Sequence, residues 1–492
     1  MCGITGFYSQ DQTYSKDDLI RMTAAISHRG PDAEGFYTDD VVGLGHRRLS
    51  IIDLSERANQ PMTSANDRYV IIYNGEVYNF SEIGARLQKE IGKSGSLKFK
   101  TSSDTEIILE AFSMKGVDFV NELNGMFAIA IYDKLEKSLY LFRDRIGIKP
   151  LYYYWDGRNF AFASELKALQ TLDQHDYRLN HQAVNTFLHV GYIPSPDSIY
   201  HNVKKLNSGC WLKVNSEGLE TRRYWNLRAK LSDNVIRNQQ QAMIRMSDLL
   251  ISSVQYQLKS DVPFGVFLSG GIDSSLITAQ AVLLSSVKVN TFSIGFEENS
   301  HNESEYAREV AKYLGTDHHE FMVSYNDAMN LIDSIISTYD EPFGDSSSIP
   351  TMLVSKLARQ YVTVTLSGEG GDELFFGYGA YNWARRLNNP AVRLFRKPAA
   401  KIFSNLSSRY QRVSRMLNYQ SETHLPAHIF SQEQYMFTDW EINNLLSPNF
   451  LENLEEYRAP SNPSALPGLF FPKINPGTAA GRSLTAMERQ AM

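Results

Sequence analysis

The strongest constraint on the fold of this 492-residue chain is an apolar run that ends in a glycine-rich turn and continues into a helical pattern. Residues 264–268 form the apolar run, Ser269-Gly270-Gly271 is the turn, and residues 273–284 have helical spacing. The alternation continues with apolar runs at residues 289–296 and 361–366 and with a helical pattern between them at residues 306–314. Strands that alternate with helices pair in parallel, and such sheets bind ligands at the carboxyl ends of their strands. The pattern predicts a doubly wound parallel sheet.

The first part of the chain has a different pattern. Short runs rich in β-branched and aromatic residues end in turn signals and alternate with helical stretches. The predicted strands include residues 68–73, 126–132 and 138–143, and the predicted helices include 17–26, 80–91 and 105–115. We expect a mixed α/β and α+β unit at residues 2–170, a connector at 171–240, the parallel-sheet unit at 241–385 and a mostly helical region at 386–492.

Composition excludes several classes of partner. The net charge of −6 gives no reason to expect nucleic acid. Cys2 and Cys210 are the two cysteines, too few for a secreted disulfide scaffold, so a reducing compartment fits better. The first twenty residues lack the apolar stretch of a secretory leader, and no run of about 18 apolar residues indicates a membrane span. We therefore expect a cytoplasmic protein with neither nucleic-acid nor membrane partners.

Cys2 is the first candidate for chemistry. Removal of the initiator methionine would leave this residue with both a thiol and a free α-amino group. An α-amine titrates at about 7.7–8.0, so it can act as the base for the adjacent thiol. One residue would then supply nucleophile and base. The alternative is a cysteine without a chemical role.

Five further positions in the first part suit a thiol amidase. Asn74 can offer a side-chain amide and Gly75 a close backbone N–H to an oxyanion. Glu76 and Asp104 can each pair with a ligand ammonium, and Arg48 can form a bidentate pair with a carboxylate. The alternatives are a hairpin turn at Asn74-Gly75, a helix N-cap at Asp104 and a solvated strand charge at Arg48.

Five ordered motifs resemble the class II, N-terminal-nucleophile glutamine amidotransferases. They are Cys2-Gly3-Ile4, His28-Arg29-Gly30-Pro31-Asp32, Arg47-Arg48-Leu49-Ser50, Asn74-Gly75-Glu76 and Ser103-Asp104-Thr105. The resemblance implies a four-layer αββα glutaminase in which Cys2 attacks glutamine and Asn74 and Gly75 form the oxyanion hole. It also implies a glutamine site made of Arg48, Leu49, Ser50, Ile51, Ile52, Asn74, Gly75, Glu76 and Asp104.

The glycine-rich turn of the second part is a candidate anion site. Backbone N–H groups of a glycine turn at a helix N-terminus bind anions. The string Ser269–Ser275 lacks the lysine of the kinase-type phosphate loop. It suits a loop that holds a departing diphosphate, with Asp273 beside it to hold Mg²⁺. The alternative is a plain glycine turn with a serine cap.

This string resembles the diphosphate loop of the N-type ATP diphosphatases. A second string, Leu366-Ser367-Gly368-Glu369-Gly370-Gly371-Asp372-Glu373, resembles the asparagine synthetase domain within that group. The resemblance implies that Glu369 assists formation of an acyl-adenylate and that Asp372 shares Mg²⁺ with Asp273. It implies an ATP site made of Leu268, Ser269, Gly270, Gly271, Asp273, Ser274, Ile294, Ser367 and Gly368. Asp340-Glu341-Pro342 also fits this family and is expected to border the acceptor pocket, with a capped turn as the alternative.

The two resemblances together imply an ATP-dependent ligase. Glutamine hydrolysis would supply ammonia, and the second part would adenylate a carboxylate, with L-aspartate as the expected acceptor. Two alternatives remain open: a sugar acid or polysaccharide precursor as the acceptor, or a glutaminase with an inert ligase half. The expected partners are small molecules, with a homodimer as an open option. The resemblance covers about residues 2–380, and the basic helical segment usual near the end of the family is not matched, so we expect an incomplete C-terminal region.

Overall fold

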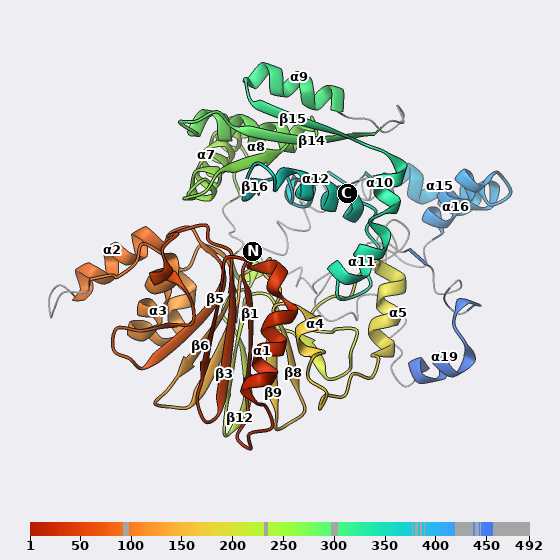
Figure 1. Cartoon of the computed structure of the whole chain (residues 1–492). Coiled ribbons are helices and arrows are strands. Elements are labelled where there is room, and N and C mark those ends of the chain that lie inside the picture. Colours follow the sequence, from red (N-terminus) through yellow and green to blue (C-terminus); the bar gives the residue numbers. More distant parts are fainter. Residues whose placement is uncertain are drawn as a thin grey trace.

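The structure is a computed structural model that describes residues 1–91, 98–230, 235–296, 304–375, 377–378, 382–383, 386–387, 389–418, 436–437, 442 and 444–455. Most of the expected C-terminal region beyond residue 418 lies outside the described residues. The described chain forms two halves, an antiparallel half and a parallel half, and the N-terminus lies between them (Figure 1). The mixed α/β class predicted from the sequence is confirmed.

The first half contains two six-stranded antiparallel sheets. One has the order β10-β8-β9-β1-β3-β2 and the other the order β12-β11-β7-β6-β5-β4. The strands of the first sheet are β1 (Gly3–Tyr8), β2 (Ala33–Thr38), β3 (Val42–Arg48), β8 (Tyr152–Trp155), β9 (Phe160–Ala163) and β10 (Val203–Lys205). Those of the second are β4 (Met62–Thr63), β5 (Tyr69–Val77), β6 (Gly125–Asp133), β7 (Ser138–Arg143), β11 (Cys210–Asn215) and β12 (Gly218–Arg223).

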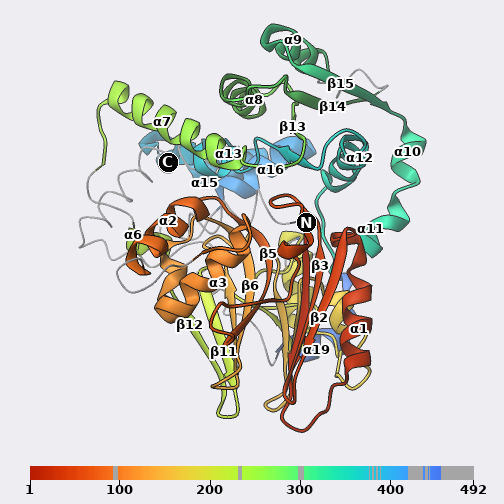
Figure 2. The ribbon, with the colours of Figure 1, turned by 60° about the vertical axis from the view of Figure 1, so that its left-hand side comes forward.

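These two sheets lie face to face with helices outside them, as Figure 2 shows. The outer helices are α1 (Lys16–Ala25) and α4 (Leu166–Leu169) on one sheet and α2 (Phe80–Ile91) and α3 (Asp104–Lys115) on the other. Along β5, Ile72 packs inward in the cluster that contains Ile4, whereas Ile71 packs outward in the cluster that contains Phe112. Successive side chains of a strand point to opposite faces. Burial of both faces therefore explains why these strands are apolar throughout.

The second half contains a four-stranded parallel sheet with the order β15-β14-β13-β16. Its strands are β13 (Phe264–Phe267), β14 (Asn290–Phe296), β15 (Asp317–Val323) and β16 (Val364–Leu366). Its helices are α7 (Gln239–Gln257), α8 (Ile272–Leu284), α9 (Ser304–Leu314) and α12 (Ser348–Ala358). Val266 packs with α7 and α8, whereas the next residue, Phe267, packs with α12. Figure 1 shows α9 and α12 on opposite sides of this sheet.

The remaining described helices are short or peripheral. They are α5 (His181–Val190), α6 (Leu227–Lys230), α10 (Tyr325–Met329), α11 (Ile332–Thr338), α13 (Gly371–Phe375), α15 (Pro390–Phe403), α16 (Ser408–Leu417) and α19 (Pro448–Glu455), with 3₁₀ turns at η1 (Ser27–Arg29), η2 (Glu56–Ala58) and η3 (Gly116–Glu122). Within the described ranges, none of the helices combines the length and the apolar character needed to span a bilayer.

The structure corrects the local prediction around Asn74. The strand predicted to end at residue 73 continues as β5 to Val77, so Asn74 and Gly75 pair with β6 instead of following the strand end. The alternative of a hairpin turn there is wrong. A Cβ on Gly75 would collide with the carbonyl of Met126, so only glycine lets β6 approach at this register.

Strands also occur where a connector was expected. Within residues 171–240, β10 joins the first sheet, and β11 and β12 join the second. β10 is a three-residue edge strand, which gives a weak sequence pattern, and β12 also lies at the edge of its sheet. β15 was not predicted either, because its sequence Asp317-His318-His319-Glu320 is polar for a strand. The division at residues 170, 240 and 385 stays a prediction.

Ion pairs that involve Asp340 and Glu341 join the halves. Lys167 Nζ lies 3.2 Å from Asp340 Oδ1 and also donates to the carbonyl of Ser337 at 2.8 Å. Lys205 pairs with Glu341, whose other oxygen accepts the N–H of Ile199 at 2.8 Å. Asp340 and Glu341 therefore dock the second half onto the first.

Candidate active site

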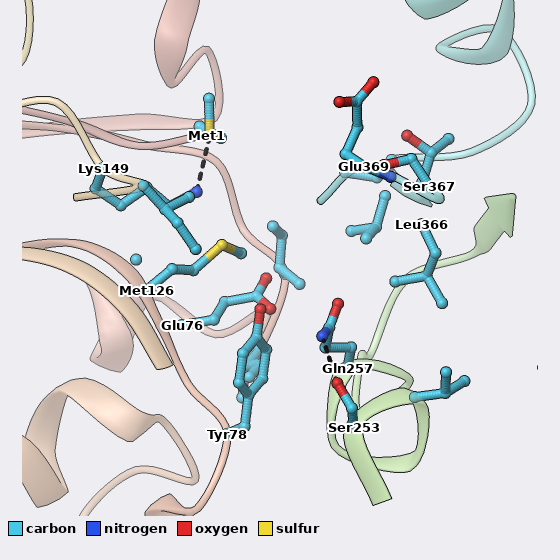
Figure 3. A pocket seen from close by; sticks show the side chains of 18 of the residues that line it. Met1, Glu76, Tyr78, Met126, Lys149, Ser253, Gln257, Leu366, Ser367 and Glu369 are labelled. Atoms are coloured by element: carbon cyan, nitrogen blue, oxygen red, sulfur yellow. Dashed lines mark hydrogen bonds between the residues drawn. The ribbon is translucent and has the colours of Figure 1, made fainter. Parts of the chain in front are cut away.

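A cavity of about 740 Å³ lies between the two halves. From the first half it is lined by Cys2, Arg48, Leu49, Ile51, Ile52, Asn74, Gly75, Glu76 and Asp104, and from the second by Asp273, Ser367, Gly368 and Glu369. Figure 3 shows Glu76, Tyr78 and Met126 on one side and Gln257, Ser367 and Glu369 on the other. Most of the predicted glutamine-site residues thus share one space with four of the predicted synthetase residues. Ser50 is absent from the described lining.

Cys2 lies directly before β1, whose pairing with β3 and β9 fixes its position. Its Sγ lies 3.4 Å from the backbone N of Leu49, and its carbonyl accepts the Nε of Arg29 at 2.9 Å. Burial raises the pKa of the Cys2 thiol. A thiol of raised pKa needs a nearby base to become a nucleophile.

The N-terminal amine is in a position to be that base. In this structure Met1 precedes Cys2, and burial lowers the pKa of its α-amine to about 6, with Arg29 and Lys149 acting in the same direction. Removal of Met1 would place the Cys2 α-amine beside the thiol in this same environment. An amine of lowered pKa is neutral at pH 7, which is the form that accepts a proton.

Asn74 and Gly75 face the cavity from the middle of β5. Asn74 is 1% exposed, and its Nδ2 has no hydrogen-bond partner among the described residues. A buried amide donor left unpaired costs free energy, so such a group signals a missing partner. An oxyanion in the cavity would supply that partner. The unpaired Nδ2 of Asn74 therefore supports the prediction that this residue contributes to an oxyanion hole.

Arg48 is buried, so its alternative as a solvated strand charge is wrong. Its Nη1 donates to the carbonyl of Ser55 at 2.9 Å and to Asn59 Oδ1 at 2.7 Å, and its Nη2 donates to the carbonyl of Asp53. These bonds hold the guanidinium at the cavity wall. Its charge faces a space in which a ligand carboxylate would be stabilised.

Glu76 and Asp104 form an acidic pair in the same wall. Burial, together with the charge of Asp104, raises the pKa of Glu76 to about 7. Burial also raises the pKa of Asp104, although its Oδ2 accepts the hydroxyl of Tyr73 at 2.8 Å and the N–H of Val77 at 3.1 Å. Two buried carboxyls that interact electrostatically favour a cation near them. Asp104 is the first residue of α3 and Ser103 is its N-cap, so the capping alternative for Asp104 is also wrong.

Sequence analysis missed Lys149. Its side chain is 3% exposed, lines the cavity and lies with Nζ 2.8 Å from the sulfur of Met1 (Figure 3). Burial lowers its pKa to about 8. Asp144 holds the loop that carries it, because the Asp144 carboxylate accepts the backbone N–H groups of Gly147 and Lys149. The feature of the sequence that could have indicated a buried lysine is its place between Ile148 and Pro150, shortly after a strand.

The Ser269–Ser275 string forms the predicted glycine turn between β13 and α8. Gly270 has φ +82°, and a Cβ there would lie 2.6 Å from the backbone N of Ala307. Ser269 Oγ and Ser274 Oγ are 2.9 Å apart, which fixes the turn against the first helical residues. The turn thus points the N-terminus of α8, a site of partial positive charge, at the end of the sheet.

The two Ser-Gly turns meet at the end of the sheet. A Cβ on Gly368 would lie 2.8 Å from the N of Ser274, and one on Gly371 would lie 2.5 Å from Asp273 Oδ2. Asp372 lies against Gly377. Among the residues described, no group of three or more His, Cys, Asp or Glu forms a metal cluster. Of the two predicted metal ligands, Asp273 lines the shared cavity and Asp372 does not appear in its described lining. The predicted ATP-site residues that are also absent from this lining are Leu268, Ser269, Gly270, Gly271, Ser274 and Ile294.

Two family models match separate parts of the chain. A family model described as a glutamine amidotransferase domain matches residues 1–225, and one described as asparagine synthase matches residues 245–466. A putative glutamine-hydrolysing asparagine synthetase of Methanocaldococcus jannaschii is 40% identical over 400 residues, covering 77% of this chain and 76% of that protein. Asparagine synthetase 1 of Bacillus subtilis is 37% identical over 77% of this chain and 59% of its own length.

Asparagine synthetase B of Escherichia coli is 32% identical over 80% of this chain and 68% of its own length. This chain therefore spans about 59% to 76% of the length of these three relatives. The two halves and their order match the two family models. The chain belongs to the glutamine-hydrolysing asparagine synthetase family of carbon–nitrogen ligases.

Proposed function

We propose that this protein converts L-aspartate to L-asparagine with ammonia from glutamine and energy from ATP, releasing AMP and diphosphate. The supporting observation is the single cavity lined by both the Cys2 constellation and the Ser367–Glu369 turn. Ammonia released at one end need not cross bulk water, which would protonate it. Because the chemistry requires ATP and a reduced thiol, we place the protein in the cytoplasm.

In the first step, the Cys2 amine takes the thiol proton and Sγ attacks the amide carbon of glutamine. Asn74 Nδ2 and the N–H of Gly75 stabilise the oxyanion. The protonated amine then gives its proton to the departing ammonia, and water hydrolyses the thioester to glutamate. Glu76 and Asp104 hold the ammonium of glutamine, and Arg48 its carboxylate.

In the second step, the acceptor carboxylate attacks the α-phosphorus of ATP, and diphosphate leaves. The turns that contain Ser269–Ser274 and Ser367–Gly368 would hold the nucleotide, with Leu268 and Ile294 against the adenosine and Glu369 beside the reacting carboxylate. Ammonia then displaces AMP. Asp273, with Asp372 nearby, fits a single Mg²⁺, which would neutralise phosphate charge, because magnesium commonly uses one or two carboxylates plus phosphates.

The fold proposal is equally specific. We propose that the first half is a four-layer αββα unit and that the second is doubly wound. The outer helices α1 and α3 and the packing of α7 and α12 on opposite faces support these assignments.

The test is diphosphate release with ATP, Mg²⁺, glutamine and a panel of carboxylates that contains aspartate and sugar acids. We expect release with aspartate. Cys2→Ala is expected to abolish the glutamine-dependent reaction and to retain the ammonium-dependent one. Release with a sugar acid alone, or glutamine hydrolysis without acceptor-dependent release, would contradict the assignment of aspartate.

A further inference from the structure

The loop after β3 forms one rim of the proposed glutamine site. Leu49, Ile51 and Ile52 line the cavity, and Asp53 then turns the chain with φ +55°, a conformation that a non-glycine residue rarely adopts. Within the first half, the Asp53 carboxylate accepts the N–H of Ser102 at 2.8 Å and the hydroxyl of Ser55. Such a turn persists when surrounding contacts hold it.

Further contacts to this loop come from the second half. Asp261 accepts the backbone N–H of Asp53 through Oδ2 at 2.8 Å, and its own backbone N–H donates to the carbonyl of Ile51 at 3.0 Å. The residue therefore binds the loop at two backbone points, on both sides of Ile52. Two hydrogen bonds on either side of one residue fix both the position and the direction of the loop.

The same short segment also contacts a second rim of the cavity. Lys259 Nζ donates to the carbonyl of Tyr78 at 3.2 Å, and Tyr78 lies two residues after Glu76 and lines the cavity. Residues 259–261 thus contact both rims of the pocket in which glutamine is proposed to bind. They lie between α7 and β13, immediately before the strand that ends at the Ser269 turn.

We infer that Asp261 is a positioning residue for glutamine, supplied to the glutaminase site by the synthetase half. It touches neither the thiol nor the reacting amide. It acts by holding the Leu49–Ile52 rim in the shape that receives the substrate. This inference rests on the proposed glutamine site and makes the two halves of the chain parts of one binding pocket.

The test compares Asp261→Ala and Asp261→Asn in the full chain, with glutamate formation from glutamine as the assay. The alanine variant loses the acceptor for the Asp53 N–H. We expect its KM for glutamine to rise about tenfold, the factor for one lost hydrogen bond to a charged group, with kcat changed less than about twofold. Asparagine keeps an acceptor oxygen, so the KM of Asp261→Asn for glutamine is expected to stay close to the wild-type value.

Lys167→Met is the matched control, because Lys167 also joins the halves but pairs with Asp340 instead of the loop after β3. We expect it to leave the KM for glutamine unchanged. An unchanged KM in Asp261→Ala, an equal rise in Lys167→Met, or a failure of asparagine to rescue would overturn the inference. The assay needs no acceptor, so a failure of aspartate to support diphosphate release would contradict the proposed function and leave this test valid.

Discussion

Asp273 and Gly371 are in contact at the end of the parallel sheet, where a Cβ on Gly371 would lie 2.5 Å from Asp273 Oδ2. The two residues are 98 positions apart, and each belongs to one of the two Ser-Gly turns. Their contact shows that the two turns lie against each other. It also explains why position 371 requires the smallest side chain.

Gly371→Ala is therefore expected to disable the synthetase half. The added methyl would push the Asp273 carboxylate away or open the two turns, at a cost of about 1–3 kcal/mol. We expect diphosphate release to fall at least about tenfold. Glutamine hydrolysis, measured on the same preparation, is expected to stay near the wild-type rate. A loss of both activities with a lowered Tm would indicate misfolding instead.

Asn74→Ala tests the oxyanion hole. Its Nδ2 makes no hydrogen bond within the described residues, so its loss is expected to leave the Tm almost unchanged. Loss of one oxyanion donor lowers kcat by about 10²–10³-fold. We expect that loss in glutamine hydrolysis and none in the ammonium-dependent reaction. A fall in Tm without a fall in kcat would assign Asn74 a structural role.

Glu76 predicts a pH dependence of glutamine binding. Burial and the charge of Asp104 raise the pKa of Glu76 to about 7. Below that pH the side chain is protonated and pairs poorly with the glutamine ammonium, so the KM for glutamine is expected to rise as pH falls from 8 to 6. Glu76→Gln should have a higher KM that varies little over this range. An equal pH slope in both enzymes would exclude Glu76 as its source.

The same carboxyl predicts the pH dependence of stability. Its folded-state pKa lies above the ordinary value of 4.5, so the folded protein binds more protons than the unfolded chain between these values. The Glu76 contribution to stability is therefore present below about pH 4.5 and lost as pH rises through about 7. Urea unfolding of the wild type and Glu76→Gln should show a difference that grows across this window in favour of the variant.

Lys149→Met tests the environment of the N-terminal amine. Burial lowers the pKa of the Met1 amine, and the Lys149 charge lowers it further. After removal of Met1, the same charge would act on the Cys2 amine. Without that charge the amine would keep its proton to higher pH. We expect the acidic limb of the kcat/KM profile for glutamine to move upward by less than about one pH unit. Lys134→Met, which removes a lysine paired with the exposed Asp67, is the control and should not move the limb.

The Lys167–Asp340 contact predicts a stability effect across the two halves. Asp340 is nearly buried, so Lys167→Met would leave its carboxylate without its cation. We expect a loss of about 2–3 kcal/mol in urea unfolding, because an uncompensated buried charge is costly. The double variant Lys167→Met, Asp340→Asn should recover much of it. Equal losses in the single and double variants would show that the ion pair itself has little effect.

The sequence by itself determined the local elements and the chemistry of the motifs. Periods of two and 3.6 residues, with glycine turns between them, predicted the strands β6, β7 and β14 and the helices α1, α2, α3, α8 and α9, because these patterns arise within one element. The ordered motifs around Cys2 and Ser367 predicted the two reactive centres. Predictions failed at edge strands such as the three-residue β10 and the polar β15, where the alternation is weak.

Only the tertiary structure decided which distant residues meet. Partners far away in the chain determine the place of Asn74 inside β5 and the burial of Lys149 beside the N-terminus. They also determine the two hydrogen bonds from Asp261 to the loop after β3. A single sequence does not specify such pairs, because spacing constrains only near neighbours. Burial then sets the pKa of Glu76 and the unpaired state of Asn74, since both depend on how much water the folded halves exclude.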